Sequence, residues 1–259
     1  MSYKGLELTG KVAVVLGGNS GIGRAIAVGF AEAGADVAPV GRRVEQVEAA
    51  AREVEALGRR SLVVTADVTD RASLERLLST TLSALGRVDI LVNSAAGQVK
   101  REPTIDCSED DWRQVLDINL TGVLRACQVF GRHMLERRYG RIINISSLNA
   151  FVSLYEVAAY AASKAGVQSL TKSLAVEWAS LGVCVNAIAP GVFPTALNSQ
   201  LLQGTPRGQE LLMRTPMKRF GKLEEIVGAA IFLASDAASF VTGSVVTVDG
   251  GFLASGVNQ

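Results

Sequence analysis

The chain has 259 residues, of which 48% are hydrophobic and 20% are charged, and its formal net charge is +1 at pH 7. This composition supports a large hydrophobic core and excludes a disordered chain. The near-neutral charge argues against a nucleic-acid or membrane-surface partner. With a single histidine, His133, we expect no His-rich metal site, no bound metal and little scope for Ser-His-Asp catalysis.

The cysteines and the N-terminal segment indicate a cellular compartment. Cys107, Cys127 and Cys184 are widely spaced and form no C-x-x-C pair, a pattern typical of buried cytosolic thiols. The first residues, "MSYKGLELTG", contain no apolar signal segment, and no uninterrupted apolar run reaches 18 residues. We therefore expect a soluble, cytoplasmic protein that does not bind a membrane.

Short apolar runs alternate with helix-length periodic segments along the chain. Strands are predicted over 11–16, 36–40, 61–66, 88–93, 141–146, 183–189 and 244–248, and helices over 21–33, 43–57, 70–85, 108–138 and 156–181. Because the strands are apolar nearly throughout, we expect a parallel sheet covered on both faces. The predicted fold is a doubly wound, seven-stranded α/β (Rossmann) sheet in one domain, residues 1–259. Pro39 conflicts with the second strand, because it cannot donate a hydrogen bond to the sheet, but its apolar neighbours favour keeping the strand.

A glycine-rich turn, "VVLGGNSGIGRAI", joins the first strand to the first helix. Gly17, Gly21 and Gly23 allow a tight turn and a close approach of the backbone to a pyrophosphate, which would bind at the helix N-terminus. The spacing is G-x-x-x-G-x-G rather than the commoner G-x-G-x-x-G, and the Gly-Lys-Ser/Thr of an ATPase phosphate loop is absent. The turn therefore predicts a dinucleotide site.

The segment "VGRR" follows the second strand, where a dinucleotide site recognises the ribose 2′ position. Gly41 occupies the position at which a carboxylate would bind the 2′-hydroxyl of NAD. Arg42 and Arg43 follow, and guanidinium groups suit a 2′-phosphate, so we expect NADP(H) to be preferred over NAD(H). The alternative is an ordinary charged helix start, although cations there oppose the helix dipole.

Tyr160 and Lys164, in "AAYAASKAG", lie one helical turn apart on the same face of a predicted helix. An ammonium beside a phenol lowers the cost of forming the phenolate, which makes the pair a usable acid and base. The alternative is a chance pairing on a helix surface, and the motif alone does not exclude it.

Together these motifs resemble those of the short-chain dehydrogenase/reductase family in its short, single-domain form. The resemblance runs from "GGNSGIG" to "VDGG" and includes "ADV", "VNSAAG", "INL", "INISS" and "PGVFPT". Ser147 lies thirteen residues before Tyr160, which is the interval of the family. Leu16, Ser94 and Ala96 depart from the usual residues of the family without removing a group that the chemistry needs.

The resemblance implies an NAD(P)-dependent oxidoreductase that interconverts a secondary alcohol and a ketone. Tyr160 would be the general acid/base, Lys164 would supply a cation and bind the nicotinamide ribose, and Ser147 would hydrogen-bond the reacting oxygen. Asn119 would hold a water on a proton path from Lys164. The alternative for Ser147 is a serine that satisfies backbone groups at a strand end. The implied cofactor-binding residues are Gly17, Asn19, Ser20, Gly21, Ile22, Gly23, Arg42, Arg43, Asp67, Val68, Asn93, Ala95, Tyr160, Lys164, Pro190, Gly191, Val192 and Thr195.

The loop "GQVKREP", residues 97–103, resembles the Arg-Arg-x-Pro loop of gluconate and ketodeoxygluconate dehydrogenases of the family. Lys100 and Arg101 could bind a sugar-acid carboxylate, with a solvated basic loop as the alternative. We expect substrate contacts from Ser147 and Asn149 and further polar contacts from Gln98 and Asn198. Residues 196–216 are expected to form a mobile lid.

We therefore expect an NADP(H)-dependent oxidoreductase for a sugar acid or polyol, assembled as a homotetramer as the resemblance implies. A 3-oxoacyl-thioester reductase is the alternative within the same enzyme class, and its basic loop would contact an acidic carrier. A non-catalytic NADP(H)-binding protein is the alternative from a different class. The combination of Asn119, Ser147, Tyr160 and Lys164 argues against it, because a sensor has no need of Tyr160.

Overall fold

A computed structural model describes residues 3–97, 100–196 and 198–256. Within these residues the strands are β1 (Val12–Leu16), β2 (Asp36–Val40), β3 (Ile90–Asn93), β4 (Gly140–Ile145), β5 (Val183–Pro190) and β6 (Val245–Val248). They form one parallel sheet in the order β2-β1-β3-β4-β5-β6. The strand order reverses at β1, and in such sheets ligands bind beyond the carboxyl ends of the strands at this point. The predicted single-domain, doubly wound α/β fold is confirmed.

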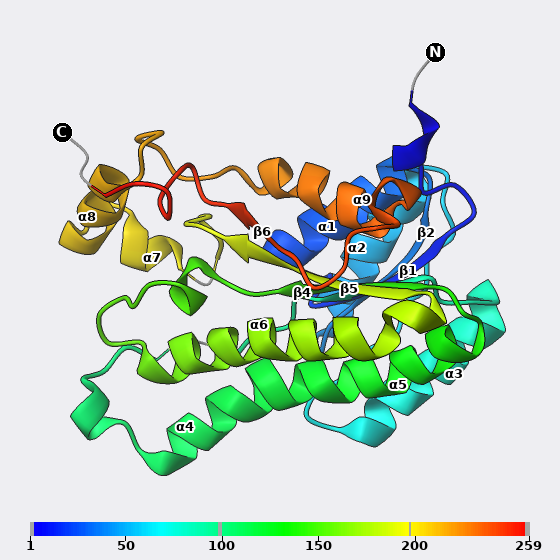
Figure 1. The fold of residues 1–259 in the computed structure, drawn as a ribbon, viewed down its shortest axis with the longest axis horizontal. Coiled ribbons are helices and arrows are strands. Elements are labelled where there is room, and N and C mark those ends of the chain that lie inside the picture. Colours follow the sequence, from blue (N-terminus) through cyan, green and yellow to red (C-terminus); the bar gives the residue numbers. More distant parts are fainter. Residues whose placement is uncertain (1–2, 98–99, 197, 257–259) are drawn as a thin grey trace.

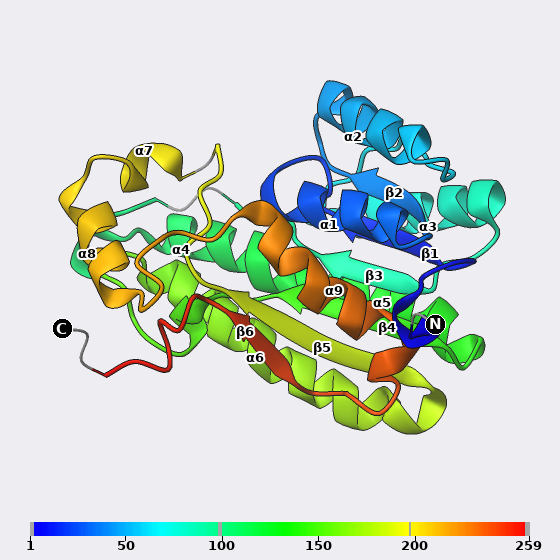
Figure 2. The same cartoon turned by 90° about the horizontal axis from the view of Figure 1, so that it is seen from above.

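Helices cover both faces of the sheet (Figures 1 and 2). On one face lie α1 (Gly21–Glu32), α2 (Val44–Ala56) and α9 (Val227–Ala234), and on the other lie α3 (Arg71–Leu85), α5 (Gly122–Glu136) and α6 (Ala158–Trp178). Alternation along β1 directs Val14 and Leu16 into the core under the second set of helices, while Ala13 and Val15 enter the core under the first set. The short 3₁₀ helices are Lys4–Leu6, Thr104–Asp106, Leu148–Ala150, Ala179–Leu181, Leu223–Ile226 and Asp236–Ala238.

The prediction of seven strands is wrong, because residues 61–66 form no regular strand. They lie outside β2 and meet it in isolated bridges, Val37 with Ser61 and Gly41 with Thr65. The Val37 amide donates to the Arg60 carbonyl, 3.1 Å away, so every second residue of β2 directs its amide towards this outer segment. Pro39 is the next residue in that series and has no amide hydrogen to donate. β2 itself persists because its other side pairs with β1 from Asp36 to Val40.

The long helix predicted over 108–138 is divided by a π-helical segment. It consists of α4 (Glu109–Leu116), the π segment Asp117–Thr121, and α5. Single π turns inside α-helices occur frequently at functional sites. Asn119 lies within this segment and is buried. The sequence prediction therefore identified the helix and missed the change of pitch at Asn119.

The segment predicted as a lid, residues 196–216, forms two short helices, α7 (Ser199–Leu202) and α8 (Pro206–Arg214). Thr205 caps α8, since its Oγ1 accepts a hydrogen bond of 3.0 Å from the Gly208 amide. Leu202 and Leu211 pack with Leu148 and Phe252 in a small apolar cluster apart from the main core. This packing places the segment beside the chain that follows β4, and its motion stays a prediction.

The structure also bears on the cysteines, on membrane-spanning helices and on clusters of metal-binding side chains. Of the three free cysteines, Cys127 is buried as expected, whereas Cys107 and Cys184 are partly exposed. Among the described residues, no helix has the length and apolarity needed to cross a membrane. The same part of the chain contains no group of three or more His, Cys, Asp or Glu side chains arranged to hold a metal ion.

Candidate active site

Tyr160 and Lys164 lie in the first two turns of α6, beside the carboxyl end of β4. The Lys164 Nζ donates a hydrogen bond of 2.8 Å to the carbonyl oxygen of Ile145, the last residue of β4. The same Nζ lies 5.6 Å from the centre of the Tyr160 ring. The two side chains therefore share one helix face, as the spacing predicts, and that face is turned towards the end of the sheet.

Burial shifts the pKa of both groups. It lowers the pKa of Lys164 to about 8, because the ammonium is removed from water. It also raises the pKa of Tyr160, and the nearby Ser147 hydroxyl offsets only part of that effect. Lys164 is buried and Tyr160 is half-buried beside the pocket, so the charge of Lys164 is poorly screened.

Ser147 follows β4, and its hydroxyl lies close enough to the Tyr160 phenol to lower the pKa of Tyr160. Its Oγ accepts a hydrogen bond of 3.2 Å from the amide of Asn149, and Ser147 thereby caps the short 3₁₀ helix Leu148–Ala150 after β4. The neighbouring Ser146 Oγ donates to the carbonyl oxygen of Lys164, 3.2 Å away. The chain after β4 is thus bonded to α6, which fixes the Ser147 hydroxyl beside the phenol.

Asn119 connects the π segment to two other parts of the site. Its Oδ1 accepts a hydrogen bond of 3.1 Å from the Gly97 amide, after β3. Its Nδ2 donates to the Ser163 Oγ, 3.2 Å away, and that hydroxyl donates to the Tyr160 carbonyl oxygen at 2.7 Å. Asn119 therefore lies in contact with α6, between the loop after β3 and the turn that carries Tyr160.

The glycine-rich turn has the shape and the donors that a pyrophosphate needs. Gly17 has φ of +81°, and a Cβ on it would lie 2.8 Å from the backbone of Ser94 and Ala95. A Cβ on Gly23 would lie 2.2 Å from the Gly17 carbonyl oxygen. Ser20 is the N-cap of α1 and makes no capping hydrogen bond through its side chain, which leaves the first amides of the helix for a ligand. These features fit a dinucleotide.

The remaining predicted cofactor residues lie at the end of, or follow, β2, β3, β5 and the outer segment 61–66. A Cβ on Gly21 would lie 3.3 Å from Cγ2 of Thr195, so the segment after β5 lies beside the turn. Arg42 lies 3.9 Å from Asp67. Burial alone would raise the pKa of Asp67, but hydrogen bonds from Thr69 and the nearby arginines lower it overall. Asn93 is buried and donates to Asn144 Oδ1, 2.8 Å away, within the sheet.

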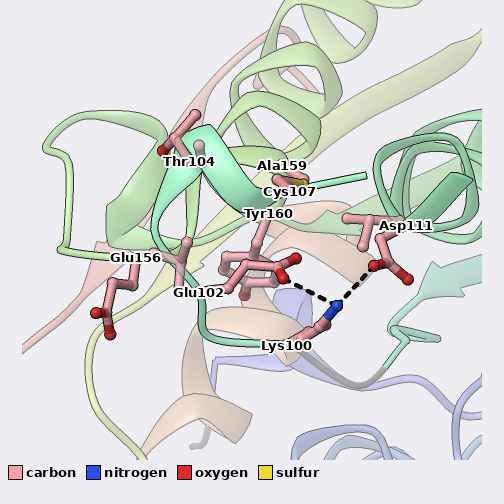
Figure 3. A pocket seen from close by; sticks show the side chains of 11 residues that line it. Lys100, Glu102, Thr104, Cys107, Asp111, Glu156, Ala159 and Tyr160 are labelled. Carbon is pink, nitrogen blue, oxygen red and sulfur yellow. Dashed lines mark hydrogen bonds and ion pairs between the residues drawn. The ribbon is translucent and has the colours of Figure 1, made fainter. Parts of the chain in front are cut away.

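Carboxylates of the protein itself pair with both predicted substrate cations. The Lys100 ammonium lies 2.8 Å from Glu102 and 2.7 Å from Asp111, as Figure 3 shows in the pocket beside Tyr160. Arg101 donates to Glu156 Oε2 at 2.7 Å. A substrate carboxylate would have to compete with these partners, and the binding of a carboxylate by Lys100 and Arg101 stays a prediction. Gln98 lies outside the described residues.

Asn198 was expected to offer polar groups to a substrate. Its Oδ1 accepts from the Thr195 amide at 2.7 Å, and its Nδ2 donates to the Phe193 carbonyl oxygen at 2.9 Å. Both ends of the carboxamide thus hold the loop after β5 in place. Asn149 differs, because its Oδ1 is buried and has no hydrogen-bond partner.

Sequence reasoning missed two residues, Glu156 and Arg207. Glu156 has φ of +65°, an unfavourable value for a residue with a side chain, and lines the pocket beside Tyr160. Arg207, in α8, donates to the Tyr155 carbonyl oxygen at 3.1 Å, and Arg101 and Glu156 both influence its pKa. No motif marks either residue, because segments distant in sequence bring them together.

Comparison with known proteins reveals similarity over nearly the whole chain. A family model described as enoyl-(acyl carrier protein) reductase matches residues 17–253. The chain is 40% identical to 2-dehydro-3-deoxy-D-gluconate 5-dehydrogenase of Dickeya dadantii, covering 96% of this chain and 97% of that protein. It is 42% identical to D-threitol dehydrogenase of Mycolicibacterium smegmatis, covering 95% and 94% of the two chains.

A solved structure is similar to this chain in both sequence and fold. The putative NAD(P)-dependent gluconate 5-dehydrogenase of Beutenbergia cavernae, with bound NADP, is 45% identical, covers 97% of this chain and 100% of its own, and has a TM-score of 0.91. The sequence similarity, the fold and the arrangement of Ser147, Tyr160 and Lys164 agree with one another. This chain belongs to the short-chain dehydrogenase/reductase family and is an NAD(P)-dependent oxidoreductase that interconverts CH–OH and C=O groups.

Proposed function

We propose that the protein interconverts a secondary alcohol and a ketone on a sugar acid, or on a related polyol, with NADP(H). The observation that carries the proposal is the Tyr160–Ser147–Lys164 arrangement in a chain about 40% identical to dehydrogenases named for sugar acids and a polyol. The polar groups around that arrangement support the same substrate class.

The nicotinamide cofactor supplies or accepts the hydride. Tyr160 gives a proton to the oxygen of the ketone as it becomes an alkoxide, and takes that proton back in the oxidation. The Ser147 hydroxyl lies beside the Tyr160 phenol, where it can hold the same substrate oxygen in line with the phenol. In this role the Ser147 hydroxyl both positions the substrate and stabilises the developing charge.

Lys164 lowers the cost of the phenolate that Tyr160 becomes after donating its proton. Its buried ammonium is held by the Ile145 carbonyl oxygen, so its position does not depend on the substrate. Asn119 lies at the other side of this turn and supports it through Ser163. We assign to Asn119 the role of holding a water that passes protons between Lys164 and solvent.

Arg101 and Arg207 form the binding site that we assign to the substrate carboxylate. Glu156 pairs with Arg101, Glu210 pairs with Arg214, and both carboxylates act on Arg207, so the three guanidinium groups exceed the two carboxylates by one positive charge. Burial and the charge of Arg101 both lower the pKa of Arg207, which is the expected effect of packing two cations together. A substrate carboxylate relieves that repulsion. Lys100 has no part in this binding, because two carboxylates already neutralise it.

Asn149 is assigned to a hydroxyl group of the substrate. Its buried Oδ1 has no partner, which is unfavourable unless a ligand supplies a donor. The residue follows Ser147 by two positions and is bonded to it through its amide. A hydroxyl on a carbon close to the reacting one would satisfy this oxygen.

Arg42 and Arg43 support a preference for NADP(H) over NAD(H). Both side chains are exposed at the end of β2, and Gly41 supplies no carboxylate for a 2′-hydroxyl. We also assign a homotetramer in the cytoplasm. The exposed apolar side chains of Ile105, Trp112 and Val176, along and beside α4 and α6, support an interface between copies, and native mass measurement tests it.

The test is the initial rate of NADPH consumption with 5-ketogluconate and, separately, with an acetoacetyl thioester, each repeated with NADH. Faster turnover of the keto-sugar acid with NADPH supports the proposal. Faster turnover of the thioester would favour the acyl-thioester reductase, the class that the description of the matching family model names. Binding of NADPH without turnover of either compound, or of a wider carbonyl panel, would favour a non-catalytic protein.

The carboxylate site is tested with Arg101→Met and Arg207→Met. Each change should raise the KM for 5-ketogluconate about tenfold, the effect of losing one charged hydrogen bond, and leave the KM for a neutral polyol within twofold. Arg113→Met is the matched control, because Arg113 is exposed on α4 and pairs with Glu109 and Asp110. Equal effects on the acid and the polyol would remove the carboxylate site from the proposal.

A further inference from the structure

The backbone at Gly41 faces the side chain of Asn19. A Cβ built on Gly41 would lie 2.3 Å from Cγ, 2.4 Å from Oδ1 and 2.6 Å from Nδ2 of Asn19. All three distances are well below van der Waals contact. A residue with any side chain therefore cannot occupy position 41 unless Asn19 moves.

Asn19 has little freedom to move. It is only 9% exposed, and its Nδ2 donates a hydrogen bond of 3.0 Å to Oε1 of Gln46, in the first turn of α2. The backbone on either side is fixed as well, because the amides of Gly17 and Gly18 both donate to the Val40 carbonyl oxygen, at 2.8 and 3.0 Å. The short side chain of asparagine cannot bend away as that of lysine or arginine could.

Position 41 is where a carboxylate would accept a hydrogen bond from the ribose 2′-hydroxyl of NAD(H). With Asn19 in place, the end of β2 offers no such acceptor. The nearby carboxylate of Asp67 already accepts from the amide and hydroxyl of Thr69, at 2.9 and 2.7 Å. The side chains that remain next to Gly41 are the guanidinium groups of Arg42 and Arg43, which donate and suit a phosphate.

We propose that Asn19, held by Gln46, determines cofactor specificity by excluding an acidic side chain from position 41. The inference rests on the proposed preference for NADP(H) and explains how the fold maintains it. It predicts that the two positions are coupled. An aspartate at position 41 recognises the 2′-hydroxyl only when position 19 is small.

The experiment measures the dissociation constants of NADPH and NADH, from nucleotide fluorescence, for wild type, Gly41→Asp, Asn19→Ala and the double variant. Gly41→Asp alone should weaken NADPH binding at least tenfold without tightening NADH binding. The double variant should bind NADH at least tenfold more tightly than Gly41→Asp does. For each protein we compare the ratio of the NADPH and NADH dissociation constants. A change at Asn19 that alters pyrophosphate binding affects both nucleotides equally and cancels in this ratio. Asn19→Ala with Gly41→Asn is the matched control and should show no gain, because it has no carboxylate.

Thermal unfolding without nucleotide gives a second readout. Gly41→Ala should lower the Tm of the wild type by several degrees, and by less than one degree in the Asn19→Ala background, because the smaller side chain leaves room for the Cβ. Equal losses in both backgrounds, or equal NADH affinity of Gly41→Asp and the double variant, would overturn the proposal. Equal binding of NADPH and NADH by the wild type would instead contradict the proposed cofactor preference. The coupling between positions 19 and 41 would then still be measured from the NADH dissociation constants of the variants.

Discussion

Lys164 is anchored to Ile145, because its Nζ donates a 2.8 Å hydrogen bond to the carbonyl oxygen of that residue. The bond joins the turn of α6 that carries Tyr160 to the end of β4, two residues before Ser147. The anchored ammonium is buried, and burial lowers its pKa to about 8. The charge that we assign to catalysis is therefore held in place at a cost in stability.

That cost predicts a pH-dependent effect of Lys164→Met. The variant should lose turnover and, at pH 7, gain stability on the order of 2 kcal/mol, because it no longer buries a charge. The pKa of Lys164 is lower in the folded protein than in the unfolded chain. Between pH 8 and about 10.5, the ordinary lysine value, wild type therefore becomes more stable relative to the variant, and the gain shrinks. Denaturant unfolding of both proteins at pH 7 and pH 10 measures the difference, and a gain that does not change with pH would contradict the burial argument.

Tyr160→Phe removes one oxygen from the site. We expect kcat to fall at least 100-fold, because no other group is placed to exchange a proton with the substrate oxygen, and the Kd of NADPH to stay within threefold. Tyr155→Phe is the matched control. Tyr155 lies five residues before Tyr160, its ring is exposed, and Arg207 bonds only to its backbone carbonyl oxygen, which the change leaves in place. If kcat of Tyr160→Phe stays within tenfold of wild type, another group performs the proton transfer.

At position 156 we expect a glycine variant to be more stable than an alanine variant, which reverses the usual order of stability. The φ of +65° at Glu156 strains any side chain, so Glu156→Gly should be about 1 kcal/mol more stable than Glu156→Ala, although both lose the ion pair with Arg101. At Ala158, the first residue of α6, glycine should instead lower stability. Urea denaturation of the three variants tests this, and an alanine variant as stable as the glycine variant would mean that the backbone relaxes.

Asp89 lies at the end of the sheet opposite to the candidate active site. We expect its replacement to change the stability of the fold and not the catalytic constants. Asp89 is fully buried, and its carboxylate accepts hydrogen bonds from the Val12 amide at 2.9 Å, from Arg87 at 2.6 Å and from Arg137 at 3.2 Å. Asp89→Asn should lower the free energy of unfolding by about 2–4 kcal/mol, because two arginines lose their counter-charge.

The control for Asp89 is Asp106→Asn, an exposed change that should stay within about 0.5 kcal/mol of wild type. The catalytic constants of Asp89→Asn should match wild type at temperatures where it is folded, since Asp89 lies before β3 and the site lies after it. A changed KM for NADPH at such a temperature would show that the network reaches the cofactor site.

The parts of the molecule that were predictable are those in which local sequence decides the structure. The turn after β1 leaves no room for a Cβ at Gly17 or Gly23, so the two glycines in the sequence already indicate its close packing. The apolar run before them indicates a buried strand, which is β1. The four-residue interval from Tyr160 to Lys164 places both side chains on one face of any helix. The alternation of strands and helices, with right-handed βαβ units, then predicts the doubly wound sheet, whereas the order of its strands comes from the structure.

The tertiary structure decided what depends on neighbours distant in sequence. Pro39 was recognised as a conflict, but only the pairing directions show that its missing amide falls on residues 61–66, which lose their regular strand while β2 keeps its pairs with β1. The charges of Lys100 and Arg101 are plain in the sequence. Whether they are free depends on Asp111, in α4, and on Glu156, in the turn before α6. Packing energies between segments, rather than local preferences, set these positions, and so the substrate side of the site was less predictable than the cofactor side.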